Sequence, residues 1–258
     1  MLGAIAGDII GSVFENNPIK SITFPLFSIN SHFTDDSVLT IAIAYSILYQ
    51  VDYGTSLKNF ARRYPNAGFG LSFYQWMQSS NRQPYNSWGN GSAMRVSPVG
   101  FAFDTAEKVT LEAQRSAAVT HNHPEGIKGA QATALAIFLA RRGTAKDRIR
   151  QTIADRFGYH FERTLDEIRP LYDFDVSCQG SVPESLLSFF ESDDFEDAVR
   201  KAISLGGDTD TMACIAGGVA QAFYGKIPSA IVEEVRKRLP EEFLEIIDEF
   251  NARFGIKY

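Results

Sequence analysis

The sequence contains little cysteine and no long run of one charge. Of its 258 residues, 2 are cysteines, Cys178 and Cys214, and neither lies at a spacing typical of a metal site. So few thiols in a chain of this size argue against a disulfide scaffold and are consistent with a reducing compartment. The formal net charge is -6, and lysine and arginine form no long stretch. The chain therefore has no electrostatic footprint for nucleic acid or for an anionic membrane.

Long hydrophobic stretches are also absent. No segment has the roughly 18 uninterrupted apolar residues that a membrane-spanning helix needs. The N-terminal stretch lacks a basic region, and Asp8 interrupts its apolar residues, which argues against a secretory signal. Hydrophobic residues make up 45% and charged residues 22% of the chain, which is ordinary for a globular protein with a sizeable core. We expect a cytoplasmic monomer without a membrane partner.

Sustained alternation of apolar and polar residues, the pattern of a half-buried strand, is missing as well. Residues 21–27 are the only weak strand candidate, and no period of about 20–50 residues repeats. The sequence predicts a single all-α domain over residues 1–258, a compact orthogonal bundle of roughly ten or more helices. One of them is expected from Val182 to Phe190. The most apolar helices should be central, at residues 2–14, 36–49, 127–141 and 211–224.

Two of these central helices begin with a concentration of carboxylates and hydroxyls. The first start is HFTDDS and the second is GGDTDT, and each leads directly into an apolar run. The oxygen-bearing side chains are Thr34, Asp35 and Asp36 in the first start, and Asp208, Asp210 and Thr211 in the second.

Helix capping and metal binding both explain these clusters. A single Asp or Thr before a helix is most often an N-cap, because its oxygen accepts a free backbone N–H. A cap needs one oxygen, however, and adjacent buried carboxylates repel one another unless a cation compensates them. Carboxylate and hydroxyl oxygens suit Mg²⁺, Mn²⁺ or Ca²⁺ rather than Zn²⁺ or Cu²⁺. The metal hypothesis requires Asp36 and Asp210 to meet in space, and it fails if they only cap separate helices.

The first predicted helix carries a stripe of small residues. Gly3, Gly7 and Gly11 recur every four residues. Because each glycine in a helix interior costs about 1 kcal/mol relative to alanine, another helix or a ligand should approach this backbone closely, and tight helix packing is the favoured interpretation. Asp8 and Glu15 lie two turns apart on nearly the same face. Glu15 falls at the helix end, where it is either a solvated acid or a catalytic group.

A glycine-rich loop forms the third informative stretch, NSWGNGSAMRVSPVG. Gly89 and Gly91 flank Asn90 and leave backbone N–H groups accessible, and Ser92 begins a helical segment. This layout suits a phosphate or a sugar hydroxyl, although most such loops are simple turns.

The loop THNHPEG contains two of the four histidines, His121 and His123. No cysteine or third histidine lies near enough in the sequence to complete a transition-metal site. The loop is expected to end one helix and begin the next, and contact of one histidine with a ligand stays open.

Taken together, these motifs carry a family resemblance. GDIIGSVFE, FTDDSVLT, GNGSAMR, THNHPEG and SLGGDTDTMACIAGGVAQAFYG occur in this order between Gly3 and Gly225. The combination resembles the ADP-ribosylglycohydrolase family, which includes a dinitrogenase reductase-activating glycohydrolase and the arginine- and serine-ADP-ribose hydrolases. The resemblance implies a compact all-α fold around two Mg²⁺ or Mn²⁺ ions. The implied metal ligands are Thr34, Asp35, Asp36, Asp208, Asp210 and Thr211.

The resemblance also implies where a substrate lies. Gly89, Asn90, Gly91, Ser92 and Met94 match a loop along the ADP-ribose, and His121 matches a histidine that contacts it. Glu15 resembles a catalytic glutamate of the serine-linked branch, whereas THNHPEG looks closer to bacterial and arginine-linked members. The acceptor therefore stays open.

The implied reaction is hydrolysis of the bond between ADP-ribose and a protein side chain or small acceptor. The implied partners are thus an ADP-ribosylated protein or a small ADP-ribose conjugate. Asp36, Asp35 and Glu15 are the candidates for activating water. Two other interpretations remain: an ADP-ribose-binding module without turnover, and a dimetal phosphohydrolase. The phosphohydrolase is disfavoured because no Lys/Arg cluster lies beside either acidic motif.

Overall fold

The structure, a computed structural model, describes all residues from 1 to 258. Its regular structure is helical, and the single isolated β-bridge joins Gly89 and Ser177. The prediction of an all-α bundle is therefore confirmed. The helices are α1 (Leu2–Gly11), α2 (Asp35–Tyr49), α3 (Tyr53–Arg63), α4 (Leu71–Gln78), α5 (Gly91–Met94), α6 (Ser97–Ala102), α7 (Ala106–Ala118), α8 (Pro124–Arg141), α9 (Lys146–Phe157), α10 (Leu165–Ile168), α11 (Cys178–Phe190), α12 (Phe195–Ser204), α13 (Thr209–Tyr224), α14 (Ser229–Lys237) and α15 (Glu241–Phe254).

Helices α1 and α13 form the centre of the molecule, and their backbones touch. Every residue of α1 is buried. A Cβ atom added to Gly7 would lie 2.0 Å from the carbonyl oxygen of Ala213, and one added to Gly3 would lie 2.5 Å from that of Gly217. Glycine is therefore needed along this stripe because α13 occupies the space of a side chain, as tight helix packing predicts.

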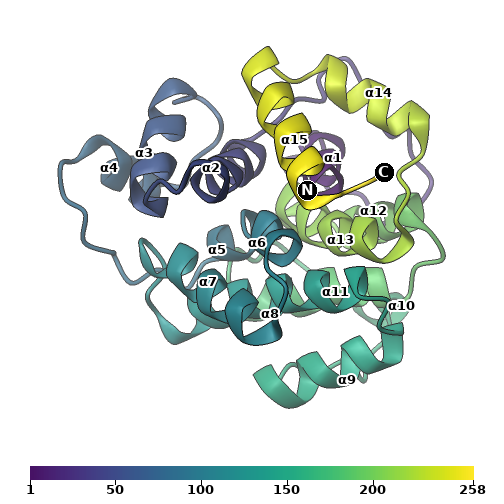
Figure 1. Cartoon of the computed structure of the whole chain (residues 1–258). Helices are drawn as coiled ribbons and strands as arrows, with labels where there is room; N and C mark the ends of the chain where they lie inside the picture. The colour runs from purple at the N-terminus through teal and green to yellow at the C-terminus, as the bar shows by residue number, and fades with distance from the viewer.

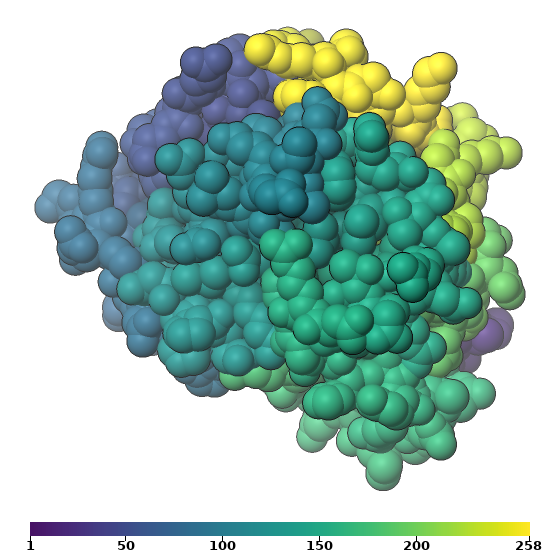
Figure 2. Space-filling model, turned by 60° about the horizontal axis from the view of Figure 1, so that its bottom comes forward, coloured from purple at the N-terminus to yellow at the C-terminus, as the bar shows by residue number.

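The other helices surround this pair (Figure 1). Helices α2 and α8, both expected to be central, bury most of their residues. Helix α4 lies at one edge of the molecule, and α9 lies at another. The face in Figure 2 is formed mainly by the central third of the sequence, and the C-terminal residues lie along its upper margin. No helix combines the length and apolarity that crossing a lipid bilayer requires.

Three sequence-based expectations differ from the structure. Residues 21–27 form no strand, and the chain there consists of bends and irregular backbone. The first helix ends at Gly11 rather than at residue 14, so Glu15 lies in the turn that follows it. Helix α11 begins at Cys178 instead of Val182, because the hydroxyl of Ser177 caps it by accepting the N–H of Gly180 at 3.0 Å, and Pro183 is accommodated inside the helix.

Candidate functional site

The two acidic helix starts meet at one end of the central helix pair. The hydroxyl of Thr209 donates to the carbonyl of Gly11 at 2.9 Å, which ties the start of α13 to the end of α1. The hydroxyl of Thr211 donates to Oδ2 of Asp36 at 3.3 Å, which connects the start of α13 to the start of α2. Segments about 175 residues apart in sequence are thus joined by side-chain oxygens.

Carboxylate oxygens gather there in two overlapping groups. Within each group, one oxygen from every member lies within 4.8 Å of the others. The first group is Asp8, Asp36 and Asp210, and the second is Glu15, Asp208 and Asp210. Because Asp210 belongs to both groups, the two clusters are contiguous. Asp36 and Asp210 are close enough to share a cation, so the condition set by the metal hypothesis is met.

Capping explains only part of the two clusters. Thr34 is the N-cap of α2, and its hydroxyl accepts the N–H of Asp36 at 3.3 Å. Asp208 occupies the N-cap position of α13, but its side chain makes no capping hydrogen bond. Its Oδ2 instead accepts Nδ2 of Asn90 at 2.8 Å, from the glycine-rich loop. The Asp208 carboxylate is therefore directed across the site rather than to its own helix.

Asp8 organises the start of α2 from the neighbouring helix. Its side chain is fully buried. Oδ1 accepts the hydroxyl of Thr34 at 2.7 Å, and Oδ2 accepts the N–H groups of Thr34 and Ser37 at 3.0 and 3.1 Å and also the hydroxyl of Ser37. With both oxygens in use, Asp8 holds the first turn of α2 in place.

The buried carboxylates have no cationic partner in the protein. None of the ion pairs includes Asp8, Asp36, Asp208 or Asp210. Burial raises the pKa of Asp36 and of Asp210 well above the usual range, and neighbouring carboxylates raise both further. Oδ1 of Asp36 is buried without any hydrogen-bond partner. This donor set of crowded, unpaired oxygens fits a hard divalent cation.

Asp35 and Glu15 lie at the edge of this cluster in different ways. Asp35 lies in the first turn of α2 but belongs to neither carboxylate group. Its Oδ1 faces Gly68, 3.5 Å from the position of an added Cβ. Glu15 is half-buried, and burial together with Asp208 and Asp8 raises its pKa. Of the three candidates for water activation, Glu15 therefore lies beside Asp208 and Asp210, whereas Asp35 lies against the cavity wall.

A cavity of about 520 Å³ opens over the carboxylates. It is lined by every predicted site residue except Ser92: Glu15, Thr34, Asp35, Asp36, Gly89, Asn90, Gly91, Met94, His121, Asp208, Asp210 and Thr211. Ser92 is fully buried, and its hydroxyl donates to the carbonyl of Gly126 at 2.6 Å. Ser92 thus anchors the glycine-rich loop to α8 from behind.

A hydrogen-bond chain that begins at Arg95 holds the ring of His121 in place. Nη2 of the buried Arg95 donates to the hydroxyl of Thr120 at 2.8 Å, and this hydroxyl lies 2.7 Å from Nδ1 of His121. The contact with Thr120 orients the ring whichever of its nitrogens carries the proton. Burial and the Arg95 charge lower the pKa of His121, so the ring is neutral. Nε2 lies 3.2 Å from an added Cβ on Gly91 and therefore faces the glycine-rich loop.

Replacing Thr120 by valine should loosen the ring of His121 without removing the histidine. The ring then loses the hydrogen bond that orients it toward the cavity, and we expect KM for the substrate to rise about tenfold with a small change in kcat. Steady-state kinetics would measure both constants. Thr120→Ser, which keeps the hydroxyl, should restore KM; equal effects of valine and serine would contradict the chain from Arg95 to His121.

Several residues of the site could not be assigned a role from the sequence. Asp8 was placed on one helix face with Glu15, but its contact with Thr34 depends on helix packing. Arg95 ends the GNGSAMR motif and is the only lysine or arginine that lines the cavity. Tyr85, Phe174 and Val176 also line it and come from loops without a recognisable pattern. His123 is a helix cap, whose Nδ1 accepts the N–H of Glu125 at 3.2 Å.

The fold and the cavity define an all-helical protein whose central helices present unpaired carboxylates suited to hard divalent cations. The sequence model of the ADP-ribosylglycohydrolase family matches residues 1–257. The chain therefore belongs to the ADP-ribosylglycohydrolase family.

Relatives and a solved structure are similar over most of the chain. The ADP-ribosylhydrolase ARH3 of Mus musculus is 26% identical over 305 residues, covering 87% of this chain and 82% of the relative. The ADP-ribosylarginine hydrolase Tri1 of Pseudomonas putida is 26% identical, covering 91% of this chain and 72% of the relative. A solved ADP-ribosylglycohydrolase-related protein complex superposes with a TM-score of 0.76 at 22% identity, covering 100% of this chain and 96% of that chain, which supports the fold.

Proposed function

We propose that this protein hydrolyses the glycosidic bond between ADP-ribose and an acceptor, with two bound Mg²⁺ or Mn²⁺ ions. The observation that carries the proposal is the pair of carboxylate groups that share Asp210 beneath a cavity lined by the glycine-rich loop. The relatives named as ADP-ribosylhydrolases support the same reaction class. The acceptor is a protein side chain or a small molecule.

The ions would be held by Thr34, Asp35, Asp36, Asp208, Asp210 and Thr211. The unpartnered Oδ1 of Asp36 and the unpaired carboxylate of Asp210 favour this assignment. Bound there, divalent cations supply Lewis acidity and fix the hydroxyls of the ribose. Asp8 orients Thr34 and the first turn of α2, so that the ligands from α2 face those from α13.

The remaining residues bind and orient the ADP-ribose. The N–H groups of Gly89 and Asn90 are used within the protein, by Ser87 and Val176, so the N–H of Gly91 and the ring of His121 are the groups of this wall that would contact phosphate or ribose oxygens. Positive charge develops at the anomeric carbon as the glycosidic bond breaks, and the nearby carboxylates stabilise it. Glu15 is the favoured group to take the proton from water, because it is half-buried beside Asp208 and Asp210 but is not held by a hydrogen bond.

The direct test is a panel of arginine-, serine- and threonine-linked ADP-ribose together with O-acetyl-ADP-ribose. Free ADP-ribose is the readout, before and after thorough chelation and after readdition of Mg²⁺ or Mn²⁺. We expect release from at least one conjugate, loss on chelation and recovery with metal. Undiminished release after chelation would contradict the metal assignment, and tight ADP-ribose binding without release would favour a binding module.

Replacing Glu15 by glutamine should slow turnover and leave the metals bound. Glutamine keeps the shape but cannot accept the proton, so we expect kcat to fall about a hundredfold. Calorimetric titration with Mn²⁺ should give an affinity close to that of the unchanged protein. If Mn²⁺ affinity instead falls in parallel with kcat, Glu15 is a ligand rather than the base.

A further inference from the structure

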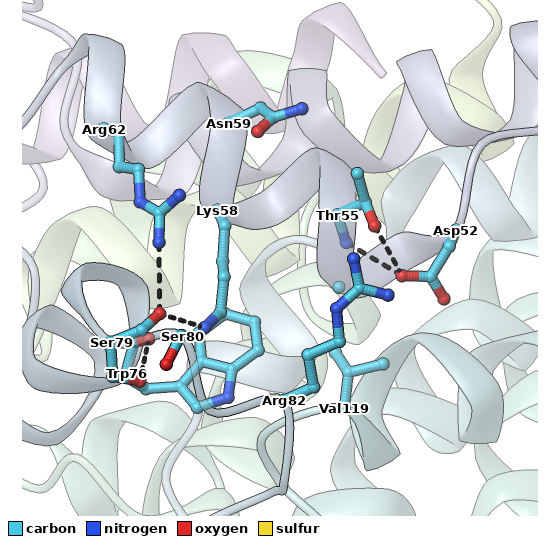
Figure 3. A pocket seen from close by; sticks show the side chains of 11 residues that line it. Asp52, Thr55, Lys58, Asn59, Arg62, Trp76, Ser79, Ser80, Arg82 and Val119 are labelled. Carbon is cyan, nitrogen blue, oxygen red and sulfur yellow. Dashed lines mark hydrogen bonds between the residues drawn. The ribbon is translucent and has the colours of Figure 1, made fainter.

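A second cavity lies at the far end of α4, away from the carboxylates. It has a volume of about 350 Å³ and is enclosed by α3, the C-terminal end of α4 and the segment that follows (Figure 3). Its lining shares no residue with the cavity that contains Asp36 and Asp210. The α4 region lies at the left edge in both overall views. This cavity belongs to no part of the proposed reaction.

Three cations line this cavity: Lys58, Arg62 and Arg82. None of them takes part in an ion pair. The only acid in the lining is Asp52, and its Oδ1 is used to cap α3 by accepting the N–H and hydroxyl of Thr55 at 2.9 and 3.0 Å. In a chain with a net charge of -6, this is a local excess of positive charge.

Backbone carbonyls satisfy these cations in part. Nζ of Lys58, whose residue is 7% exposed, donates to the carbonyls of Ser79 and Asn81 at 2.8 and 2.6 Å. Nε of Arg62 donates to the carbonyl of Met77 at 2.6 Å. These contacts hold the C-terminal end of α4, where the helix dipole favours positive charge. They neutralise no charge, and burial together with Arg62 and Arg82 lowers the pKa of Lys58.

Trp76 and Arg82 make no side-chain hydrogen bond within the protein. Trp76 is only 6% exposed, and its indole Nε1 is buried without a hydrogen bond. Figure 3 shows the indole at the floor of the cavity, with its nitrogen on the edge nearer Arg82. Arg82 itself is exposed and makes no ion pair with Asp52. The indole nitrogen is enclosed by protein atoms, so Trp76 lies beside a ligand in the cavity, and the exposed Arg82 is the free cation that such a ligand would meet.

We propose that this cavity is a binding site for a phosphate-type oxyanion, a single phosphoryl group held by Lys58 and Arg82 beside the Trp76 indole. A tetrahedral oxyanion supplies negative charge and several acceptors at once, which the cations lack. A nucleobase could not stack on Trp76, because Nζ of Lys58 already covers the ring at 4.4 Å from its centroid. The ligand is either free phosphate or the phosphoryl end of a monoester.

The fluorescence of Trp76 tests this site in the full-length protein. The chain has 2 tryptophans, so Trp88→Phe leaves Trp76 as the only one. This protein is titrated with inorganic phosphate, with AMP and with chloride at matched ionic strength. We expect a saturable change with phosphate or AMP and none with chloride. The stronger of the two ligands identifies free phosphate or a monoester as the source.

Arg82→Ala in the same background removes a cation that does not hold α4 in place. We expect its affinity for the phosphate ligand to fall at least tenfold. Arg142→Ala is the matched control, because Arg142 is also exposed and forms no ion pair, and it should bind as before. The proposal is overturned if no saturable change occurs, if chloride produces the same change, or if the Arg82→Ala protein responds unchanged.

Discussion

Replacing Asp36 by asparagine should abolish metal binding and ADP-ribose release together. Oδ1 of Asp36 is buried and unpartnered, and Oδ2 lies 3.3 Å from the hydroxyl of Thr211, so this carboxylate connects both acidic helix starts. Asparagine keeps the volume but removes a negative charge and half of the acceptor capacity. We expect Mn²⁺ affinity to fall at least about a hundredfold and turnover to fall about a thousandfold or more.

Calorimetry with Mn²⁺ and ADP-ribose release from the best conjugate measure the two effects on one preparation. Asp194→Asn is the matched control, because Asp194 caps α12 by accepting the N–H of Asp197 at 2.8 Å, and asparagine caps equally well. Wild-type Mn²⁺ affinity in the Asp36→Asn protein would show that Asp36 only shapes the start of α2. In the metal-free protein, loss of this charge should raise thermal stability, because it relieves repulsion among Asp8, Asp36 and Asp210.

Replacing Gly7 by alanine should cause the largest loss of stability available from one methyl group. The added Cβ would lie 2.0 Å from the Ala213 carbonyl oxygen and 2.7 Å from the Cys214 nitrogen, which are backbone atoms that cannot rotate away. The two central helices must separate, and we expect the free energy of unfolding to fall by about 3 kcal/mol. For a chain of this size, that lowers Tm by roughly 6–12 °C.

Calorimetric melting of the Gly7→Ala protein measures this loss. Gly70→Ala is the control, because a Cβ there meets nothing within 4 Å and the backbone needs no positive φ. The same substitution at Gly7 should also weaken Mn²⁺ binding, although no ligand is touched, because α13 carries Asp210 and Thr211 into the site. An unchanged Tm would mean that the helices can separate without cost, contrary to the packing described.

The sequence predicted the elements of the site better than their connections. HFTDDS and GGDTDT were recognised because three oxygen-bearing residues exceed what a cap needs, and their meeting is observed between Asp36 and Thr211. The contribution of Asp8 could not be predicted, because its four hydrogen bonds form only when α1 lies beside the start of α2. Asp35, in contrast, was expected in the cluster because it adjoins Asp36 in sequence, but it belongs to neither carboxylate group.

The sequence did not predict helix ends and side-chain pairs that depend on tertiary contacts. The helix expected to reach residue 14 ends at Gly11, where the backbone of α13 packs against it and Thr209 binds the Gly11 carbonyl. The helix expected from Val182 begins one turn earlier, at Cys178, because the hydroxyl of Ser177 caps it there. Arg95 and Thr120 gave no signal as a pair, because their contact crosses from the glycine-rich loop to the end of α7.

Asp210 belongs to both carboxylate groups, and this has a consequence for how the protein would load its ions. An ion at one group withdraws electron density and negative charge from the carboxylate that the other group also uses. The two occupancies are then thermodynamically linked, and the linkage is reciprocal. The second ion would consequently bind less tightly than the first, so that half-loaded molecules are populated over a range of metal concentrations.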